Sequence, residues 1–249
     1  MKIIYHPHYE RVYASDPAAK PGRMESITKH VMPDYELVTP EPASITDVKL
    51  VHTNFHMAQV QRESDTYEAA LLAAGGAIHA AELAAAGEPA FGLIRPPGHH
   101  ASADHCWGFC FFNNMAISIA RLRQKRIIDT ALILDIDLHF GDGTENIFLN
   151  VPEIIYLHPE VRARDGFVKN ITELLSRHAV DIIGVSAGFD RHIDDWGGQL
   201  TTEDYFATGK TVKDFSEKVC RGRRFGVLEG GYNHEVLGKN VRAFVDGMK

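Results

Sequence analysis

The sequence predicts an α/β protein, a three-layer sandwich in which a mostly parallel central sheet carries helices on both faces. Three observations support this fold class. Short aliphatic runs recur along the whole chain, longer segments with helical periodicity separate them, and the runs are continuously apolar rather than alternating. Strands that are buried on both faces of a parallel sheet have this pattern. The chain has 249 residues, 45% of them hydrophobic, and no break in composition, so we expect a single domain over residues 1–249.

Six apolar runs are expected to form the strands. They cover residues 2–5, 91–94, 130–137, 153–157, 181–187 and 224–230. The clearest helix is the alanine-rich segment 65–86, with Asp65 or Thr66 as its N-cap and Gly87 just past its end. Its small side chains indicate close packing on the sheet. Further helices are expected over residues 113–124, 170–178, 202–219 and 233–247.

Charge and cysteine content exclude several classes of protein. The net charge is -7 with both signs interspersed, which argues against direct binding to nucleic acid or to an acidic membrane surface. No stretch approaches the roughly 20 apolar residues of a membrane span, and the N-terminus has no secretory apolar region. The three cysteines, Cys106, Cys110 and Cys220, form no CxxC pair. A cytoplasmic protein in a reducing compartment is therefore expected.

The chemically informative stretches all follow predicted strands. RPPGHHASADHCWGFCFFNN follows the strand at 91–94, DIDLHFGDGT closes the next, SAGFDRHIDD follows another and LEGGYN the last. The carboxyl ends of parallel strands line one edge of the sheet, where binding sites form. We therefore expect these four segments to build one site.

Asp135, Asp137 and His139 alternate along the end of a strand, so their side chains should face the same side. Buried carboxylates are very costly when unpaired, and a divalent metal resolves that cost. Two carboxylates and an imidazole suit zinc, although Fe²⁺ or Co²⁺ would also be accepted. A catalytic zinc usually has three protein ligands, and Asp190 is the expected third contributor. The alternative is a hydrogen-bonded turn in which Asp142 caps the next helix.

His99 and His100 follow two prolines and a glycine, which present adjacent imidazoles from a rigid turn. Adjacent side chains diverge, so they suit acid–base chemistry near bound water, each oriented by a carboxylate. The alternative is a pair of solvated loop histidines. Tyr232 lies on a diglycine turn at the same edge, where a phenol can donate to an oxyanion; the alternative is an ordinary core tyrosine.

Five motifs together, RPPGHHA, GFCFFNN, LDIDLHFGDGT, VSAGFDRHIDD and VLEGGYN, resemble the histone deacetylase superfamily. That superfamily includes acetylpolyamine amidohydrolases and acetoin-utilisation proteins on the arginase/deacetylase fold, and the resemblance runs from about Tyr5 to the C-terminus. It implies a deacylase that removes acyl groups from acyl-lysine or acylated amines and polyamines by metal-activated water.

The resemblance also implies roles for individual residues. Zinc would be held by Asp137, His139 and Asp190. Asp135 and Asp142 would support the catalytic pair His99 and His100, and Tyr232 would polarise the acyl carbonyl. A structural potassium ion would be bound by backbone carbonyls around the same strand, with contributions from Asp135, Asp137, His139, Tyr156 and Leu157.

Several positions depart from the family pattern. Phe140 stands where many relatives have a second histidine, so an altered channel floor is expected. Gly108 and Phe109 match one wall of the acyl-lysine tunnel, whereas the loop that builds the opposite wall has no match between Glu160 and Lys169. The second potassium site of the family would fall in the same segment, which has no match to the family pattern. These trimmed loops predict an open-mouthed deacylase that tolerates varied acyl amines.

Two shortened N-terminal segments complete the departures. In AAKPGRME only Pro21 and Arg23 align with the family, and Arg23 is expected near an inner cavity behind the metal. Asp65 or Glu63 is the candidate substrate-binding carboxylate in the trimmed loop before the alanine-rich helix.

Other polar residues have simpler interpretations. His52 and His56 are expected as an exposed helical pair rather than a metal site. Partial burial is expected for Cys106 and Cys110. Trp196 and His192 are expected as rim or packing residues, although His192 and Asp195 follow the family pattern. Arg221, Arg223 and Arg224 should form a solvated helix end.

Two rival functions remain at this point. An arginase-like ureohydrolase with two manganese ions would need further aspartates, but the chain has DLHFGD and AGFDRH. A binding protein that recognises acylated ligands without hydrolysis would not need both histidines and Tyr232.

Overall fold

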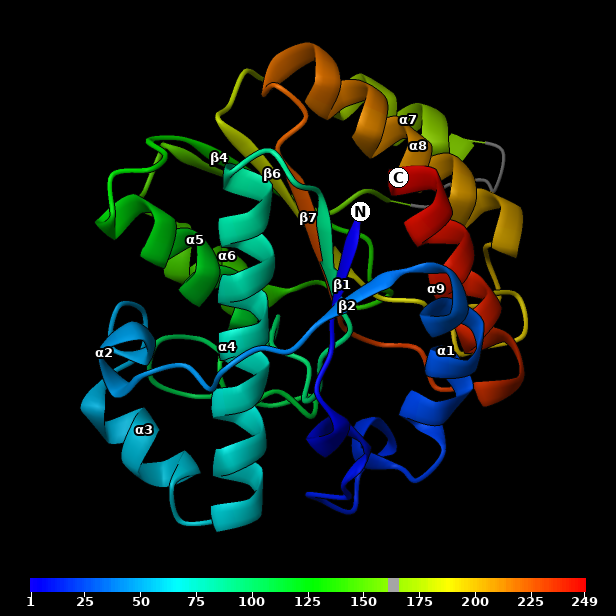
Figure 1. Cartoon of the computed structure of the whole chain (residues 1–249). Helices are drawn as coiled ribbons and strands as arrows, with labels where there is room; N and C mark the ends of the chain where they lie inside the picture. The colour runs from blue at the N-terminus through cyan, green and yellow to red at the C-terminus, as the bar shows by residue number, and fades with distance from the viewer. Residues whose placement is uncertain (161–165) are drawn as a thin grey trace.

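The computed structural model describes residues 1–160 and 166–249, which form a three-layer α/β sandwich (Figure 1). Within these residues one sheet of seven strands has the order β2-β1-β3-β7-β6-β4-β5, and every neighbouring pair is parallel. The strands are β1 (Lys2–Ile4), β2 (Glu36–Val38), β3 (Ala90–Gly92), β4 (Ala131–Asp135), β5 (Ile154–Leu157), β6 (Ile182–Ala187) and β7 (Arg224–Leu228). The predicted fold class is confirmed.

Helices cover both faces of the sheet. In Figure 1, α4 and α5 lie on one side of the strands, and α1, α8 and α9 lie on the other. The helices are α1 (Arg23–Val31), α2 (Ile45–Val48), α3 (Asn54–Val60), α4 (Ser64–Ala85), α5 (Asn114–Gln124), α6 (Asp142–Phe148), α7 (Phe167–Leu175), α8 (Thr202–Val219) and α9 (His234–Met248). Every residue of β4, β6 and β7 is buried, because helices cover both faces at the middle of the sheet.

All six predicted strands form, but the structure corrects some boundaries. The edge strand β2 was not predicted. Helix α7 begins three residues before the expected position at residue 170. Helix α4 begins at Ser64, with Glu63 in the N-cap position and no side-chain cap, so the prediction of Asp65 or Thr66 as N-cap is wrong. Gly87 has φ +92°, the left-handed conformation expected just past a helix end.

The small residues of α4 do bring it close to its neighbours, as predicted. A Cβ atom on Gly76 would lie 2.6 Å from Cγ2 of Ile94 and 2.7 Å from the Tyr9 hydroxyl. A Cβ atom on Gly75 would meet the Glu41 carbonyl oxygen at 1.9 Å. Glycine is therefore required at Gly75 because the Glu41 backbone approaches so closely, and Gly76 leaves room for the side chains of Ile94 and Tyr9.

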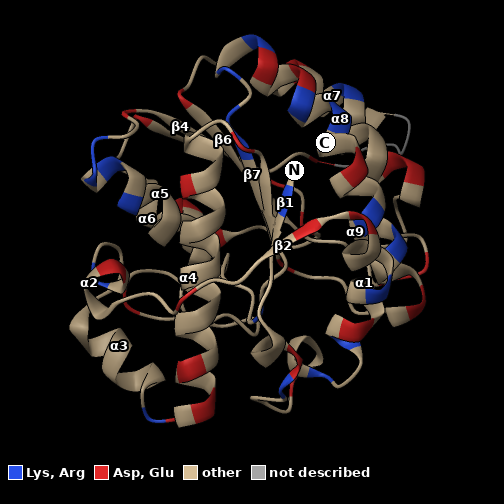
Figure 2. Ribbon diagram, viewed as in Figure 1, with Lys and Arg blue, Asp and Glu red and all other residues tan. Residues whose placement is uncertain are grey.

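Charged side chains are mixed on the outer surface, with both signs along α7, α8 and α9 (Figure 2). Arg224 is an exception to the predicted solvated arginine cluster, since it is only 3% exposed. Its Nε donates to the Met248 carbonyl at 2.7 Å, so it joins the first residue of β7 to the end of α9. Among the described helices, none is both long and apolar enough to cross a membrane.

Candidate active site

The four predicted segments meet at the carboxyl edge of the sheet. They follow β3, β4, β6 and β7, and together they surround an open cleft of about 370 Å³. The cleft is lined by Pro97, His99, His100, Trp107, Gly108, Phe109, His139, Trp196 and Tyr232. Imidazoles, a phenol and a metal-ligand candidate therefore share one solvent-accessible space.

Asp137, His139 and Asp190 come together beside this cleft. One ligand atom from each lies within 4.8 Å of the others. Nδ1 of His139 lies 3.3 Å from Oδ1 of Asp137 and 3.1 Å from Oδ2 of Asp190. Backbone N–H groups hold the remaining oxygens, with Gly230 donating to Oδ2 of Asp137 at 2.8 Å and Leu138 to Oδ1 of Asp190 at 3.0 Å.

This cluster fits a tetrahedral metal ion. Two ligands about 2.1 Å from such an ion lie about 3.4 Å apart, close to the two separations above. Both carboxylates are buried, and burial together with the charge of Asp137 raises the pKa of Asp190 to about 6. The two carboxylates raise the pKa of His139 to about 10. The three side chains thus form an anionic, N/O-donor pocket that favours a divalent cation.

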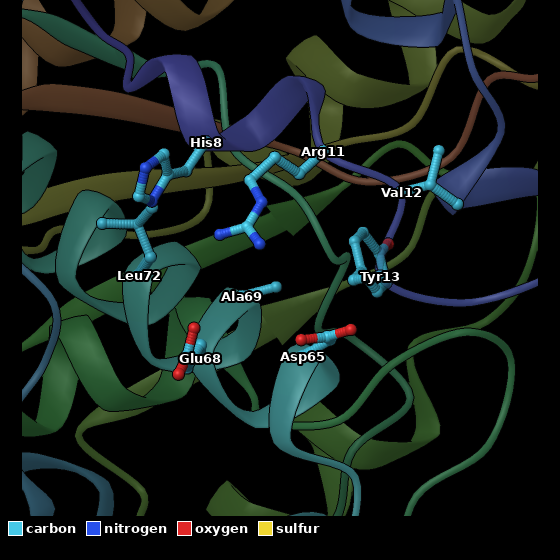
Figure 3. A pocket seen from close by; sticks show the side chains of 8 residues that line it. All are labelled: His8, Arg11, Val12, Tyr13, Asp65, Glu68, Ala69 and Leu72. Carbon is cyan, nitrogen blue, oxygen red and sulfur yellow. The ribbon is translucent and has the colours of Figure 1, made fainter.

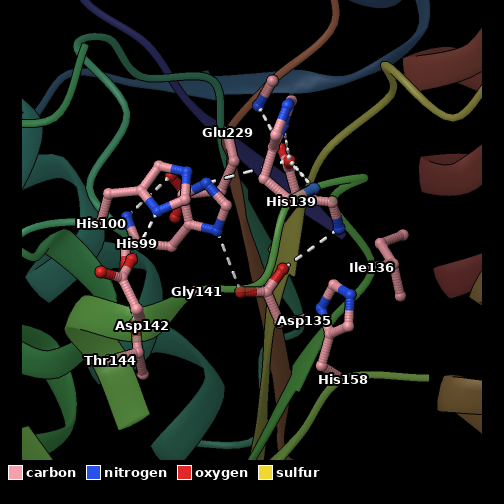
Figure 4. Close-up of polar contacts among 12 residues, drawn as sticks. His99, His100, Asp135, Ile136, His139, Gly141, Asp142, Thr144, His158 and Glu229 are labelled. Atoms are coloured by element: carbon pink, nitrogen blue, oxygen red, sulfur yellow. Dashed lines mark hydrogen bonds and ion pairs between the residues drawn. The ribbon is translucent and has the colours of Figure 1, made fainter. Parts of the chain in front are cut away.

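His99 is paired with Asp135, as Figure 4 shows. Its Nδ1 lies 3.1 Å from Oδ2 of Asp135, and the Tyr156 hydroxyl donates to the same oxygen at 2.9 Å. Burial alone would lower the pKa of His99, but the carboxylates of Asp135 and Asp137 outweigh it and raise the pKa well above its ordinary value. The Asp135 carboxylate thus orients the His99 ring and favours its charged form.

His100 is paired with Asp142 in a different environment. Its Nδ1 lies 2.7 Å from Oδ1 of Asp142, while the Trp107 indole donates to Oδ2 at 2.9 Å and stacks on the imidazole with ring centres 3.9 Å apart. Burial and the neighbouring charge of His99 lower the pKa of His100. Adjacent histidines thus have pKa values shifted in opposite directions.

Glu229 and Cys110, which sequence reasoning did not assign to the site, hold the histidine turn. Oε2 of Glu229 accepts the N–H groups of Gly98 at 2.7 Å and His99 at 3.2 Å, and Sγ of Cys110 accepts the N–H of His100 at 3.4 Å. Burial raises the pKa of Cys110, so the thiol remains protonated. The position of Glu229 inside the motif LEGGYN could have indicated a role in the site. Its hydrogen-bond partners are backbone N–H groups, however, and these cannot be identified from a sequence motif.

Tyr232 is fixed from three sides. Its backbone N–H donates to Oδ2 of Asp195 at 2.8 Å, and its ring stacks on Trp196 with centres 4.1 Å apart. Arg23 lies against the other side, with its guanidinium carbon 5.6 Å from the ring centre. Nε of Arg23 also donates to the Gly231 carbonyl at 2.9 Å. Arg23 therefore braces the diglycine turn rather than standing apart from it.

Gly108 and Phe109, expected to form one wall of a tunnel, line the cleft. Both have positive φ, 67° and 60°, and a Cβ on Gly108 would lie 2.4 Å from Cδ2 of His100. The Phe109 ring packs edge-on to Tyr232 at 6.0 Å. Residues 161–165 of the shortened segment expected to leave the opposite wall open lie outside the described residues. Trp196, expected as a rim residue, is 54% exposed at the mouth.

Three candidate substrate-binding residues are not among those that line the cleft. Phe140 is 44% exposed and packs edge-on against Tyr156, so it does not line the floor. Asp65 lines a separate small cavity with Arg11 and Tyr13 (Figure 3). Glu63 borders a third hollow on the surface. Substrate binding by these side chains is not supported by their positions.

His52 and His56 are not an exposed helical pair. Both are buried, and His52 precedes α3 rather than lying on it. Nε2 of His52 accepts the N–H of Asn113 at 2.9 Å, and Nε2 of His56 lies 2.7 Å from the Phe111 carbonyl oxygen. The prediction of exposure is wrong because tertiary contacts with the segment after GFC bury both rings.

Two oxygens among the expected potassium ligands already have hydrogen-bond partners in the protein. The Asp137 carbonyl accepts a hydrogen bond from Nε of Arg191 at 2.9 Å. The Tyr156 hydroxyl is engaged between Asp135 and the N–H of Gly141, which donates to it at 2.8 Å. Leu157 is the last residue of β5 beside them. At the Asp137 carbonyl, a guanidinium thus occupies the place where a cation would replace its hydration shell.

Comparison with known proteins identifies relatives of this chain. The sequence pattern described as "Histone deacetylase domain" matches residues 18–159 and 161–248. A probable deacetylase of Methanothermobacter thermautotrophicus is 30% identical, over 100% of this chain and 90% of that protein. A probable deacetylase of Archaeoglobus fulgidus is 34% identical, over 80% of this chain and 70% of that protein. The human polyamine deacetylase HDAC10 is 30% identical, over 71% of this chain and 32% of that protein.

A solved structure has the same fold. The crystal structure of the HDA15 HD domain superposes with a TM-score of 0.82 at 22% identity, covering 98% of this chain and 90% of that one. The sequence matches and the shared fold lead to one conclusion: this chain is a member of the histone deacetylase family, with the deacetylase and amidohydrolase character of its relatives.

Proposed function

We propose that this chain is a zinc-dependent amidohydrolase that removes acetyl or other acyl groups from acyl-lysine side chains or from acylated amines such as polyamines. The observation that carries the proposal is the cluster of Asp137, His139 and Asp190 at the same cleft as His100 and Tyr232. Fe²⁺ or Co²⁺ would satisfy the same donors.

His100 is the proton acceptor in this proposal. A divalent ion in the cluster supplies a Lewis acid that activates water and polarises an acyl carbonyl. Because the pKa of His100 is lowered, its imidazole is neutral near pH 7, and the Asp142 contact at Nδ1 leaves Nε2 to take the proton from the attacking water. The same nitrogen then returns a proton to the leaving amine.

His99 and Tyr232 stabilise developing charge. The raised pKa of His99 favours a positive charge beside the cleft, where it would stabilise an oxyanion. Burial raises the pKa of the Tyr232 phenol, so the hydroxyl stays protonated and donates to the oxyanion that forms as the carbonyl is attacked. Asp195, which holds the Tyr232 backbone, acts as a positioning residue.

The cleft supports a broad choice of acyl amine. Trp107 and Trp196 are each more than half exposed at the mouth, where they offer flat apolar surfaces rather than a closed tunnel. Relatives named polyamine deacetylase and histone deacetylase-like amidohydrolase are compatible with small acylated amines as substrates. We also propose a cytoplasmic location, which the free thiols of Cys106, Cys110 and Cys220 support.

The test is an activity screen on the metal-loaded full chain. Acetyl-lysine peptides, longer acyl-lysine peptides and acetylated diamines are compared, before and after treatment with a chelator. We expect comparable turnover of a bulky acyl-lysine peptide and a free acetylated diamine, loss of activity on chelation and its return with Zn²⁺. Strict selectivity for the slender amine would contradict the open cleft.

Variants separate the proposed chemistry from contamination. His100→Ala and Tyr232→Phe should each lower kcat by about 10²- to 10⁴-fold while the bound zinc content stays unchanged. His178→Ala, after α7 and away from the cleft, is the matched control and should keep full activity. Undiminished activity in both site variants would refute the mechanism. Stoichiometric zinc without hydrolysis of any substrate would favour the binding-protein alternative.

A further inference from the structure

Arg191 places a buried positive charge behind the metal-ligand loop. It directly follows Asp190 and is only 3% exposed. Its Nε donates to the carbonyl oxygens of Ile136 at 3.1 Å and Asp137 at 2.9 Å, and Nη2 lies 3.3 Å from the Pro159 carbonyl oxygen. Three main-chain carbonyls from two separate loops therefore converge on one guanidinium.

The remaining donors of Arg191 are also engaged. Nη2 lies 2.9 Å from Nε2 of His158, and Nη1 donates to Oε1 of Gln199 at 3.1 Å. The guanidinium carbon stacks 5.5 Å from the centre of the Phe167 ring. A buried arginine with this many partners stays charged, because its side chain is not deprotonated in proteins.

The position of this charge matters because three buried carboxylates lie nearby. Asp135, Asp137 and Asp190 are each at most 1% exposed. A divalent ion would balance Asp137 and Asp190, which leaves Asp135 beside His99 in a region of low dielectric. A fixed monovalent cation hydrogen-bonded to the backbone carbonyls of Ile136 and Asp137 adds a positive charge beside this group of buried carboxylates.

We propose that the Arg191 guanidinium takes the place of the structural potassium ion in this chain. It uses the Asp137 carbonyl that the ion would need, and it supplies the same single positive charge. Unlike an exchangeable ion, it is covalently attached to the residue next to Asp190. It therefore ties the loops at Ile136, Pro159 and Gln199 together at all potassium concentrations.

The first experiment measures the Tm of the zinc-loaded wild-type chain in KCl, NaCl and choline chloride at equal ionic strength. A bound ion that prefers the folded state would raise Tm as its concentration rises. We expect the same Tm in all three salts, and the same kcat on an acetylated substrate. A wild-type Tm that is higher in KCl than in both other salts would overturn the proposal.

The second experiment uses Arg191→Ala, with the exposed Arg177→Ala as matched control. We expect Arg191→Ala to lower Tm by about 5–15 °C, because carbonyls and carboxylates lose their buried cation. The deficit should be smallest in KCl. An equal deficit in all three salts, or no deficit, would overturn the equivalence with potassium, and Arg177→Ala should leave Tm unchanged.

Arg191→Lys covers the case in which Arg191→Ala fails to fold. It keeps the charge but loses the fork of donors, so its Tm should fall less than that of the alanine variant and remain independent of the salt. The Arg191 guanidinium would make the stability of the proposed active site independent of the cation in solution. Of the measurements above, only kcat rests on the proposed function. Salt-independent Tm in a protein without hydrolysis would refute the function and leave the Arg191 inference standing.

Discussion

The indole N–H of Trp107 donates to Oδ2 of Asp142 at 2.9 Å, while Oδ1 of the same carboxylate lies 2.7 Å from Nδ1 of His100. Trp107 also stacks on the His100 ring. One side chain thus orients both the proposed base and the carboxylate that selects its tautomer.

Trp107→Phe tests this arrangement, since it keeps an aromatic ring but removes the N–H donor. We expect kcat to fall about threefold to tenfold with little change in KM, because a charge-assisted hydrogen bond to Asp142 is lost at a half-exposed position. Trp107→Leu, which also loses the stacking, should fall further. Steady-state kinetics of both variants measure these decreases in kcat. A wild-type kcat in Trp107→Phe would show that the indole N–H does not contribute to the orientation of His100.

Asp142→Asn should move the pH profile in a defined direction. Burial and His99 lower the pKa of His100, and the hydrogen bond and charge of Asp142 oppose that shift. Without the carboxylate the pKa of His100 falls further, so the acid limb of kcat/KM moves to lower pH. The maximal rate should fall about 10- to 100-fold as the tautomer is no longer fixed. An acid limb that moves to higher pH would argue against His100 as the base.

Asp195→Ala should lower activity without affecting metal binding. Oδ2 of Asp195 accepts the N–H groups of Tyr232 and Asn233, both at 2.8 Å, so its loss frees the turn that carries the phenol. We expect kcat to fall about 10- to 100-fold with unchanged zinc content. Asp194→Ala removes the exposed neighbouring carboxylate and is the control. Equal kcat values in Asp195→Ala and Asp194→Ala would show that Asp195 does not position Tyr232.

Glu229→Gln should change the pH dependence of stability. Burial raises the pKa of Glu229 to about 7, from an ordinary value near 4.5, so the folded protein binds more protons than the unfolded chain between these pH values. The wild-type free energy of unfolding therefore falls as pH rises through this window, by up to about 3 kcal/mol from this group. Glutamine removes that contribution.

Urea unfolding at pH 5 and pH 8 measures the effect. The difference in the free energy of unfolding between Glu229→Gln and wild type should shift in favour of the variant from pH 5 to pH 8. A pH-independent effect of the amide on stability cancels in this comparison. The exposed Glu153→Gln is the control and should track wild type. A variant that loses stability relative to wild type on going to pH 8 would show that the Glu229 carboxylate is stabilised by its partners.

The middle of the sheet could be predicted from the sequence because its strands are buried on both faces. β4, β6 and β7 are continuous apolar runs, and the chemistry at their carboxyl ends follows from parallel topology. The edge strand β2 could not be predicted in the same way. Its three residues are mostly exposed, so neither an apolar run nor an alternating pattern marks it.

Residues that act through backbone groups were hardest to predict. Asp137 and His139 could be paired from alternation along one strand, with Asp190 added from the segment after the parallel strand β6, whereas Glu229 binds N–H groups of residues 98 and 99. Phe140 was expected near the substrate because it stands where many relatives have a second histidine, but the chain turns after the strand and carries its ring to Tyr156. Burial of His52 likewise depends on a segment some sixty positions away, which local periodicity does not report.

Arg23 donates to the carbonyl oxygens of Glu229 and Gly231, contacts that span 206 and 208 positions of the chain. During synthesis α1 therefore emerges long before its partner exists. A nascent chain that still lacks residues 229–231 has no turn for Arg23 to brace and no Tyr232 to position. The brace on the turn that carries Tyr232 can therefore form only after residues 229–231 have been synthesised, long after α1.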